Sequence, residues 1–263
     1  MSTWKLNYVG KKPALRSPIL VEGLPGIGNV GKIAIDFIID EIGAKKIGEF
    51  QSYAMPHSVF VNEENLVELP SIELYAKQFK NGNDLLLLAG DIQPIDEESC
   101  FQFTDAVLDA AQEFGCSEVI TLGGIALKQV PKQPQVFLTG NDKSIVNSYK
   151  KGTKLSNNLY GIVGPIVGVS GVMLGLAGKR KIKAVSLLAE TYGHPMYVGI
   201  AGARELIRVL NTKLNLRLGM KQLEKELAEI EADIAENPEF APQLAHRSLA
   251  KLRKSKSDTS YIG

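Results

Sequence analysis

A glycine-rich turn between an apolar strand and an apolar helix is the first feature of this sequence that could do chemistry. The segment ILVEGLPGIGNVGKIAIDFII carries glycines at positions 26, 28 and 31, and Lys32 follows. Gly26 to Gly31 match the GxGxxG pattern, in which the backbone N–H groups of a turn and helix hold a pyrophosphate. Glu49 follows about twenty residues later, where an acid that binds the ribose of a dinucleotide is expected.

The same turn nearly matches the phosphate-binding loop of ATPases. Gly26 is followed after four residues by Gly31 and Lys32, but Ile33 stands where a Ser or Thr hydroxyl would bind magnesium. Asp91, at the end of the run LLLLAGD, resembles the acidic half of such a site. Because an isoleucine cannot bind a metal, the pattern gives ATP hydrolysis little support.

Two interpretations of the turn remain open. Gly26, Gly28, Gly31 and Lys32 could form a nucleotide- or nucleoside-binding site, but Glu22 at the end of the strand would repel a phosphate. Alternatively, the glycines allow a sharp turn and a close approach of the helix to the sheet. We favour the second interpretation.

The other reactive side chains form no complete catalytic set. His57 and His194 each neighbour a proline, and with Glu190 they could form a metal or acid–base site. They lack the spacing of a helical metal motif, so we expect turn residues with local hydrogen bonds. Ser170 lies in GVSGV, which does not match the nucleophile elbow GxSxG. We therefore predict no catalytic residue, no metal and no cofactor.

Composition predicts a cytoplasmic protein that binds neither nucleic acid nor membrane. The net charge is +1, which gives no general attraction to polyanions. Cys100 and Cys116 belong to no CxxC pair and are expected to be reduced. The apolar runs are too short to span a bilayer, and the polar first residues lead us to expect no signal peptide.

Apolar runs alternate with helical periods along most of the chain. The predicted strands are PILVEG, IGEFQSY, SVFV, SIELYAKQF, DLLLLAG, SEVITLG, QVFLTG, LYGIVG and IKAVSLLAE. The predicted helices are Val30–Ile42, Ser99–Phe114, Lys143–Lys150, Val172–Lys179 and Ile200–Leu214. This alternation predicts an α/β fold with a mixed sheet between helices, because the short strands between Lys46 and Phe79 indicate hairpins.

A different pattern begins after Asn211. Apolar residues recur at spacings of four and three, as in a heptad repeat, at Leu216, Met220, Leu223, Leu227, Ile230 and Ile234. Asn237 and Pro238 end this helix. Leu223, Leu227 and Ile230 could pack on the same subunit or pair with a partner helix, and the pattern leaves both possibilities open.

The last residues predict a flexible tail. RKSKSDTSYIG is basic and polar and cannot bury enough apolar area to fold. It ends in Tyr261, Ile262 and Gly263, so an aromatic anchor and a terminal carboxylate are available for docking to a partner. We expect an N-terminal extension (1–16), a core domain (17–214), a heptad helix (215–237), a short helix (238–252) and a tail (253–263).

Five motifs in their order along the chain resemble a known family. They are VEGLPGIGNVGKIAIDFII, LLLAGDIQP, VITLGGIA, GIVGPIVGVSGVMLGLA and AVSLLAETYGHP. Over roughly Ser17 to Pro238 the chain resembles the archaeal branch of the proteasome assembly chaperone family. The resemblance implies a three-layer α/β/α fold like that of nucleoside phosphorylases, without their activity. It also implies homo-oligomers that bind the α-subunits of the proteasome core particle.

The resemblance also implies a role for the tail. In that family a hydrophobic residue, a tyrosine and any final residue can enter pockets between α-subunits. Here Tyr261 is third from the end and Ser260 precedes it, so the tail is a shifted variant of the motif. We therefore expect a non-enzymatic, oligomeric protein that binds the proteasome α-ring. The alternative is a nucleotide- or nucleoside-binding enzyme of the ATP-grasp or carboligase type.

Overall fold

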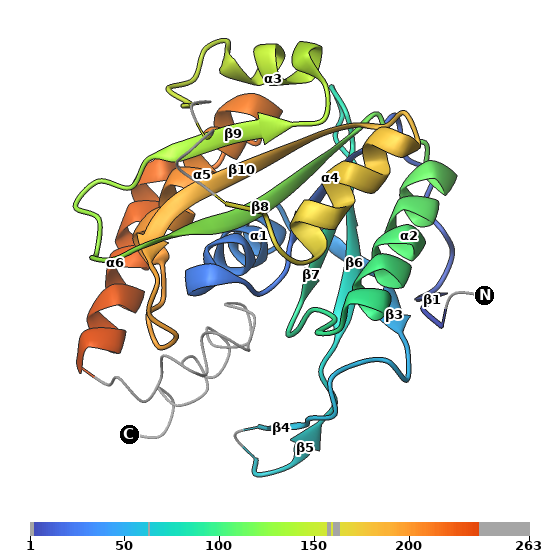
Figure 1. Cartoon of the computed structure of the whole chain (residues 1–263), viewed down its shortest axis with the longest axis horizontal. Helices are drawn as coiled ribbons and strands as arrows, with labels where there is room; N and C mark the ends of the chain where they lie inside the picture. The colour runs from blue at the N-terminus through green and yellow to red at the C-terminus, as the bar shows by residue number, and fades with distance from the viewer. Residues whose placement is uncertain (1–2, 63, 157–158, 160–163, 237–263) are drawn as a thin grey trace.

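The computed structural model describes residues 3–62, 64–156, 159 and 164–236 (Figure 1). Its main sheet has eight strands in the order β1-β3-β6-β7-β2-β8-β10-β9, and β4 pairs with β5 in a separate hairpin. The strands are β1 (Lys5–Tyr8), β2 (Ile19–Gly23), β3 (Lys45–Gln51), β4 (Phe60–Val61), β5 (Val67–Glu68), β6 (Ile72–Lys77), β7 (Leu85–Gly90), β8 (Glu118–Leu127), β9 (Val136–Gly140) and β10 (Lys183–Tyr192).

Six α-helices and one short 3-10 helix accompany the strands in the described residues. They are η1 (Ile27–Asn29), α1 (Val30–Glu41), α2 (Glu97–Glu113), α3 (Lys143–Lys150), α4 (Val169–Lys179), α5 (Ile200–Leu214) and α6 (Met220–Glu236). No helix in these ranges is long and apolar enough to cross a membrane.

The centre of the sheet is parallel and its flanks are antiparallel. Strands β7, β2, β8 and β10 run parallel to one another, and every residue of β7 is buried. A strand that is covered on both faces needs such a continuous apolar run, because neither face meets water. Strands β1, β3 and β6 extend one side of the sheet in antiparallel pairs, and β9 does so on the other side. The predicted mixed sheet is confirmed.

Two apolar cores lie on the two faces of the sheet. One core joins the sheet to α1, α3, α5 and α6, and the other joins it to α2 and α4. Figure 1 shows α2 and α4 in front of the sheet and α1 behind it. Helices α2, α3 and α5 each bury an apolar stripe and leave a polar side to solvent, whereas every residue of α1 from Val30 to Ile38 is buried. The helices thus cover both faces of the sheet, as predicted.

Several elements begin and end where the sequence predicts. Helices α3 and α5 match their predicted ranges, and the side chain of Asp142 caps α3 by accepting from the backbone N–H of Ser144 and Ile145. Strand β1 was not predicted. It pairs with β3, and the neighbouring Trp4 is buried, so part of the expected N-terminal extension belongs to the main sheet. Most of the predicted strand LYGIVG lies outside the described residues.

Candidate functional site

The glycine turn is a tight connection that packs against the strands beside it. Gly28 and Asn29 adopt left-handed conformations, with φ of 62° and 51°. The carbonyl of Gly28 accepts a hydrogen bond from the N–H of Gly199 at 2.7 Å. A Cβ atom on Gly28 would lie 2.6 Å from Oγ1 of Thr191, so a larger residue does not fit. The turn is therefore held by the protein's own backbone.

Gly31 of the turn and Gly124 of β8 allow the turn and helix α1 to approach the sheet closely. A Cβ atom on Gly31 would lie 2.6 Å from the carbonyl oxygen of Leu122 in β8. A Cβ atom on Gly124 would collide with the carbonyl of Ile27. Both approaches leave room only for glycine, which supports the interpretation that Gly31 lets the helix pack closely on the sheet, whereas a Cβ atom on Gly26 would meet no atom within 4 Å.

Lys32 points into the protein rather than toward a ligand. Its side chain is 1 % exposed, and its Nζ lies 2.9 Å from Oδ2 of Asp36, one helical turn along α1. Burial raises the pKa of Asp36, although the charge of Lys32 opposes this change. A phosphate-binding lysine must instead present its ammonium group to the ligand, so the structure does not support the nucleotide-binding alternative.

Glu22 is a second charged group that is fully buried, at the end of β2 before the turn. Its carboxylate accepts from the N–H of Leu24 at 2.9 Å and from the hydroxyl of Ser170 at 2.9 Å. Burial is the main cause that raises its pKa to about 7, and the two hydrogen bonds oppose the change. Ser170 therefore serves as a partner of Glu22 at the start of α4.

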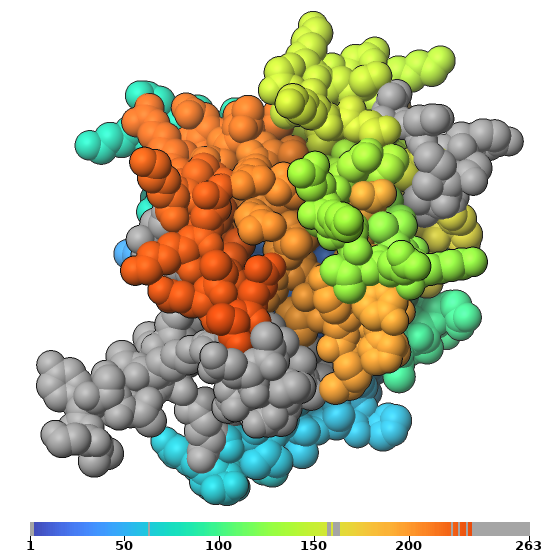
Figure 2. Space-filling view, turned by 90° about the vertical axis from the view of Figure 1, so that its left-hand side faces the viewer, coloured from blue at the N-terminus to red at the C-terminus, as the bar shows by residue number. Residues whose placement is uncertain are grey.

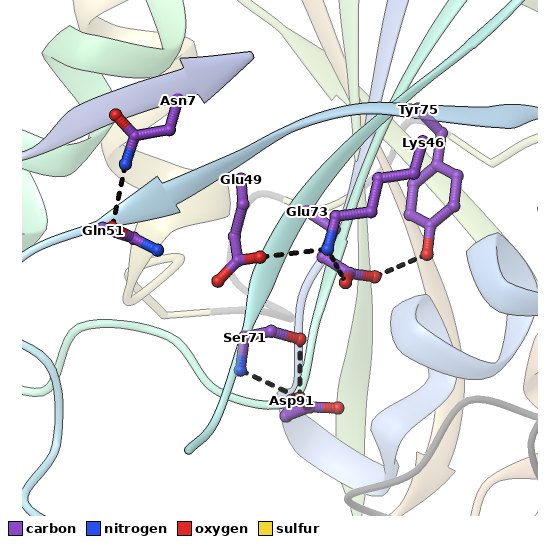
Figure 3. Close-up of polar contacts among 8 residues, drawn as sticks. All are labelled: Asn7, Lys46, Glu49, Gln51, Ser71, Glu73, Tyr75 and Asp91. Atoms are coloured by element: carbon purple, nitrogen blue, oxygen red, sulfur yellow. Dashed lines mark hydrogen bonds and ion pairs between the residues drawn. The ribbon is translucent and has the colours of Figure 1, made fainter. Parts of the chain in front are cut away.

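The two acids that the nucleotide interpretation required have other partners (Figure 3). Glu49 lies on β3 and forms an ion pair with Lys46 at 2.9 Å, and Lys46 also reaches Glu73 on β6 at 2.5 Å. Asp91 follows β7 and accepts from both the N–H and the hydroxyl of Ser71 at 2.9 Å. Glu49 thus pairs within its own strand, and Asp91 joins the end of β7 to the residue before β6, so the predicted roles at a ribose or a magnesium ion gain no support.

The histidines and cysteines form no chemical centre in the described residues. His194 stacks on Tyr192 and its Nδ1 accepts from the N–H of Met196, while Glu190 accepts from the N–H of Gln135. His57 is exposed in a loop.

The described ranges hold no group of three or more side chains that could bind a metal ion. Cys100 and Cys116 are free, and burial raises the pKa of Cys116 to about 12. A thiol with so high a pKa is a poor nucleophile at neutral pH, because little of it is thiolate.

Helix α6 packs on its own subunit (Figure 2). Leu223 is 1 % exposed and Leu227 is fully buried, and both belong to the core that includes α1 and α5. An ion pair of 2.5 Å between Arg208 on α5 and Glu224 on α6 lies beside them. Of the two possibilities left open by the sequence, these two leucines therefore pack on their own subunit rather than on a partner helix. The side chain of Ile230 lies outside the described residues.

The predicted docking residues are not part of the described structure. Tyr261, Ile262 and Gly263 lie in 237–263, which the structure does not describe. Their role at a partner protein remains a prediction from the sequence.

Two surface features lie at the ends of β3 and β6. One is the projecting hairpin β4–β5, within the region where short strands predicted hairpins, and the other is an unpredicted cleft of about 380 Å³ with several lysines in its wall. The hairpin has a sequence signal, because VFVNEENLVEL places polar turn residues between two short apolar runs. The cleft has none, since its residues come from three separate segments and meet only in the fold.

Comparison with known proteins places this fold among characterised relatives. PbaB of Pyrococcus furiosus, described as an archaeal proteasome activator, has 29 % identity and a TM-score of 0.79 over 90 % of this chain and 99 % of that one. PbaA of the same organism, described as a homologue of proteasome-assembly chaperone, shares the fold, with 23 % identity and a TM-score of 0.71 over 98 % of this chain and 99 % of that one.

The chain is also similar to a curated archaeal sequence over almost its whole length. MJ1210 of Methanocaldococcus jannaschii, an uncharacterised protein, is 26 % identical over 249 residues, which are 95 % of this chain and 93 % of that protein. The model of the PAC2 family matches residues 20–237, which include the strands from β2 to β10, apart from Ile19, and helices α1 to α6. The family resemblance inferred from the five motifs is thereby confirmed: this chain belongs to the PAC2 family.

Proposed function

We propose that this protein is a non-enzymatic, homo-oligomeric cytoplasmic protein that binds the α-subunits of the proteasome core particle. It acts there as an assembly chaperone or as an activator. The observation that carries this proposal is the similarity to PbaB, the archaeal proteasome activator with 29 % identity. The inward ion pair of Lys32 and the close packing of the glycine turn support a role without nucleotide chemistry.

Contact with the α-ring is assigned to the end of the chain. Tyr261 and Ile262 provide an aromatic and an aliphatic anchor, and Gly263 provides the terminal carboxylate. Burial of one aromatic and one isoleucine contributes only about 3–5 kcal/mol before the cost of ordering the chain. Several copies of the tail on one oligomer raise the effective concentration, so that weak individual contacts give stable binding.

Capture of the core particle tests this assignment. The full chain, a chain that ends at Thr259, and the matched control Ser260→Ala are immobilised at equal density and exposed to assembled core particles. The full chain and the control are expected to retain the particle, and the shortened chain is expected to lose it. Equal capture by all three would reject the tail as the docking element.

The choice between the two physiological roles needs a second measurement. An activator raises the rate at which mature core particles cleave a short peptide, because it opens their entrance. An assembly chaperone instead increases the yield of particles formed from separate α- and β-subunits. The cleavage rate and the yield of particles are both measured with and without the full chain. The proposed function is contradicted if the chain changes neither of them.

A further inference from the structure

The hairpin β4–β5 presents apolar side chains to solvent away from the body of the protein. It projects beyond the sheet between β3 and β6 in Figure 1. Val61 is 61 % exposed, Val67 is 69 % exposed and Leu69 is 80 % exposed. A two-stranded hairpin is marginally stable by itself in water, and clustered apolar exposure of this kind marks an interaction site. The exposed side chains of Val67 and Leu69 therefore form an apolar surface at which a partner can bind.

The hairpin is also acidic, which restricts its partner. The segment FVNEENLVEL (residues 60–69) contains three glutamates and neither lysine nor arginine. Two of the glutamates, Glu64 and Glu68, are exposed beside the apolar side chains. A complementary surface must combine basic groups with some apolar area.

The lysine cleft has this composition. Its volume is about 380 Å³, and its walls combine four lysines with four apolar residues and no acid. The lysines are Lys11, Lys45, Lys46 and Lys77, and the apolar residues are Val9, Pro13, Ile47 and Ala76. Lys46 forms ion pairs with Glu49 and Glu73. No ion pair found among the described residues involves the other three lysines.

The hairpin and the cleft lie at opposite ends of the same two strands. The hairpin follows the end of β3 and precedes the start of β6, whereas Lys45 begins β3 and Lys77 ends β6. At roughly 3.3 Å per residue these strands separate the two features by about 20 Å. The hairpin of one subunit therefore cannot enter its own cleft, but it can reach the cleft of a neighbouring subunit.

We propose that the acidic hairpin of one copy of this chain docks in the lysine cleft of the next copy. The contact joins two different surfaces, so repetition around an axis closes a ring in which every hairpin and every cleft is used. The inference rests on the homo-oligomer proposed above and names its interface. It assigns the hairpin valines to apolar contacts, and it places Glu64 and Glu68 opposite the unpaired lysines.

A charge swap between two variants tests the contact. One variant carries Glu64→Lys and Glu68→Lys, and the other carries Lys45→Glu and Lys77→Glu. Each full-length variant, and a 1:1 mixture of them, is analysed by sedimentation velocity at low salt. Each variant alone places like charges across the contact, which is expected to weaken association roughly hundredfold. The mixture restores opposite charges wherever the two variants alternate and is expected to associate again, with the wild-type mass if the ring has an even number of subunits.

The matched control for the cleft variant is Lys143→Glu with Lys179→Glu. It makes the same change in net charge as Lys45→Glu with Lys77→Glu, but on α3 and α4. It is expected to keep the wild-type mass. Wild-type assembly by either swapped variant alone, or a mixture that stays dissociated, would overturn the interface. Circular dichroism melting curves verify that each variant is folded.

A chemical cross-link gives an independent measurement without charge reversal. Val67→Cys and Lys77→Cys are combined in one chain and treated with a short bismaleimide. Covalent ladders from this variant support the contact, while only monomers from it overturn the contact if the wild type is oligomeric. If the wild type is monomeric, the proposed homo-oligomer itself is rejected. The role of the tail is tested separately, by the capture experiment with the chain that ends at Thr259.

Discussion

Lys32 and Asp36 form a buried ion pair one helical turn apart on α1, with 2.9 Å between Nζ and Oδ2. Their side chains are 1 % and 5 % exposed, so each charge has lost most of its water and depends on the other. This pair explains why a sequence that nearly matches a phosphate-binding loop does not present a lysine to a phosphate. The charge of that lysine is already compensated inside the fold.

Removal of one member of this pair is expected to destabilise the protein strongly. Asp36→Ala leaves the ammonium group of Lys32 buried without a counter-charge, which costs about 3–5 kcal/mol. The double variant Lys32→Met with Asp36→Leu removes both charges and is expected to return to within about 1 kcal/mol of the wild type. Urea unfolding followed by circular dichroism measures both differences in free energy.

The exposed pair Lys225–Glu229 on α6 provides the control for this experiment. Its side chains are 72 % and 63 % exposed, with the same spacing of four residues along a helix. Lys225→Ala is expected to change the free energy of unfolding by less than about 0.5 kcal/mol. An Asp36→Ala variant as stable as this control would contradict the account of a buried ion pair.

Two glycines of the turn are expected to respond differently to the same substitution. Gly31→Ala places a Cβ atom 2.6 Å from the carbonyl of Leu122, which forces α1 away from β8 and costs about 2–3 kcal/mol. Gly26→Ala meets no atom within 4 Å at an extended φ of −160°, so it is expected to be neutral or slightly stabilising.

Thermal unfolding of the two glycine variants measures the difference. Equal destabilisation by the two variants would contradict the packing explanation, because alanine would then be tolerated no better at Gly26 than at Gly31. If the turn bound a phosphate instead, both substitutions would be expected to alter ligand binding rather than the stability of the free protein.

Leu227→Ala distinguishes packing within the subunit from packing between subunits. Leu227 is fully buried in the core that includes α5, so its truncation is expected to cost about 2–5 kcal/mol. The mass of the oligomer is expected to stay unchanged, because this side chain already has its neighbours in its own subunit. Sedimentation and chemical unfolding measure the two quantities, with Glu229→Ala as the control on the outer face of α6. A change in mass with little loss of stability would assign α6 to a subunit contact.

The sequence predicts the helices and central strands well where local signals agree with the fold. Helix α3 begins where Asp142 caps it, and α5 covers its predicted range, since caps and apolar spacing are local properties. Strand β7 is recognisable because a strand covered on both faces must be continuously apolar. The family follows from the order of five motifs, although no single motif is specific.

Features that depend on contacts between residues far apart in the chain could not be predicted from the sequence. Strand β1 has four residues, and it forms a strand only because β3 offers its edge. The direction of Lys32 depends on Asp36 and on the packing around α1, and GxxxxGK looks the same with the lysine turned inward or outward. The lysine cleft combines residues from the segment after β1 with residues of β3 and β6, whose approach is a property of the sheet.

The buried carboxyl of Glu22 makes the stability of the protein depend on pH in a defined direction. Burial raises its pKa from 4.5 to about 7 in the folded protein, whereas the unfolded chain returns to the lower value. Between these two pH values the folded state binds the proton more tightly than the unfolded state does. The free energy of unfolding therefore falls as the pH rises through this window, by about 3 kcal/mol from this group alone.

Glu22→Gln removes the titration, and its single amide oxygen can accept from the N–H of Leu24 while its NH2 group can donate to the hydroxyl oxygen of Ser170. The free energy of unfolding of the wild type is expected to fall between about pH 4.5 and 7, and that of the variant is expected not to show this fall. The stability of the variant relative to the wild type therefore increases as the pH rises. Urea unfolding at several pH values across this window measures the difference between the two curves.

Asp142→Asn is the control for this pH dependence. The hydroxyl of Ser144 is the main group that holds the pKa of Asp142 below its usual value of 3.8, so this group titrates below the window and acts in the opposite direction. The control is expected to keep the wild-type slope between pH 5 and 7, because both folded and unfolded Asp142 are ionised there. Parallel curves for Glu22→Gln and the wild type would mean that Glu22 is ionised in the folded protein throughout, and that its two hydrogen bonds outweigh the loss of water.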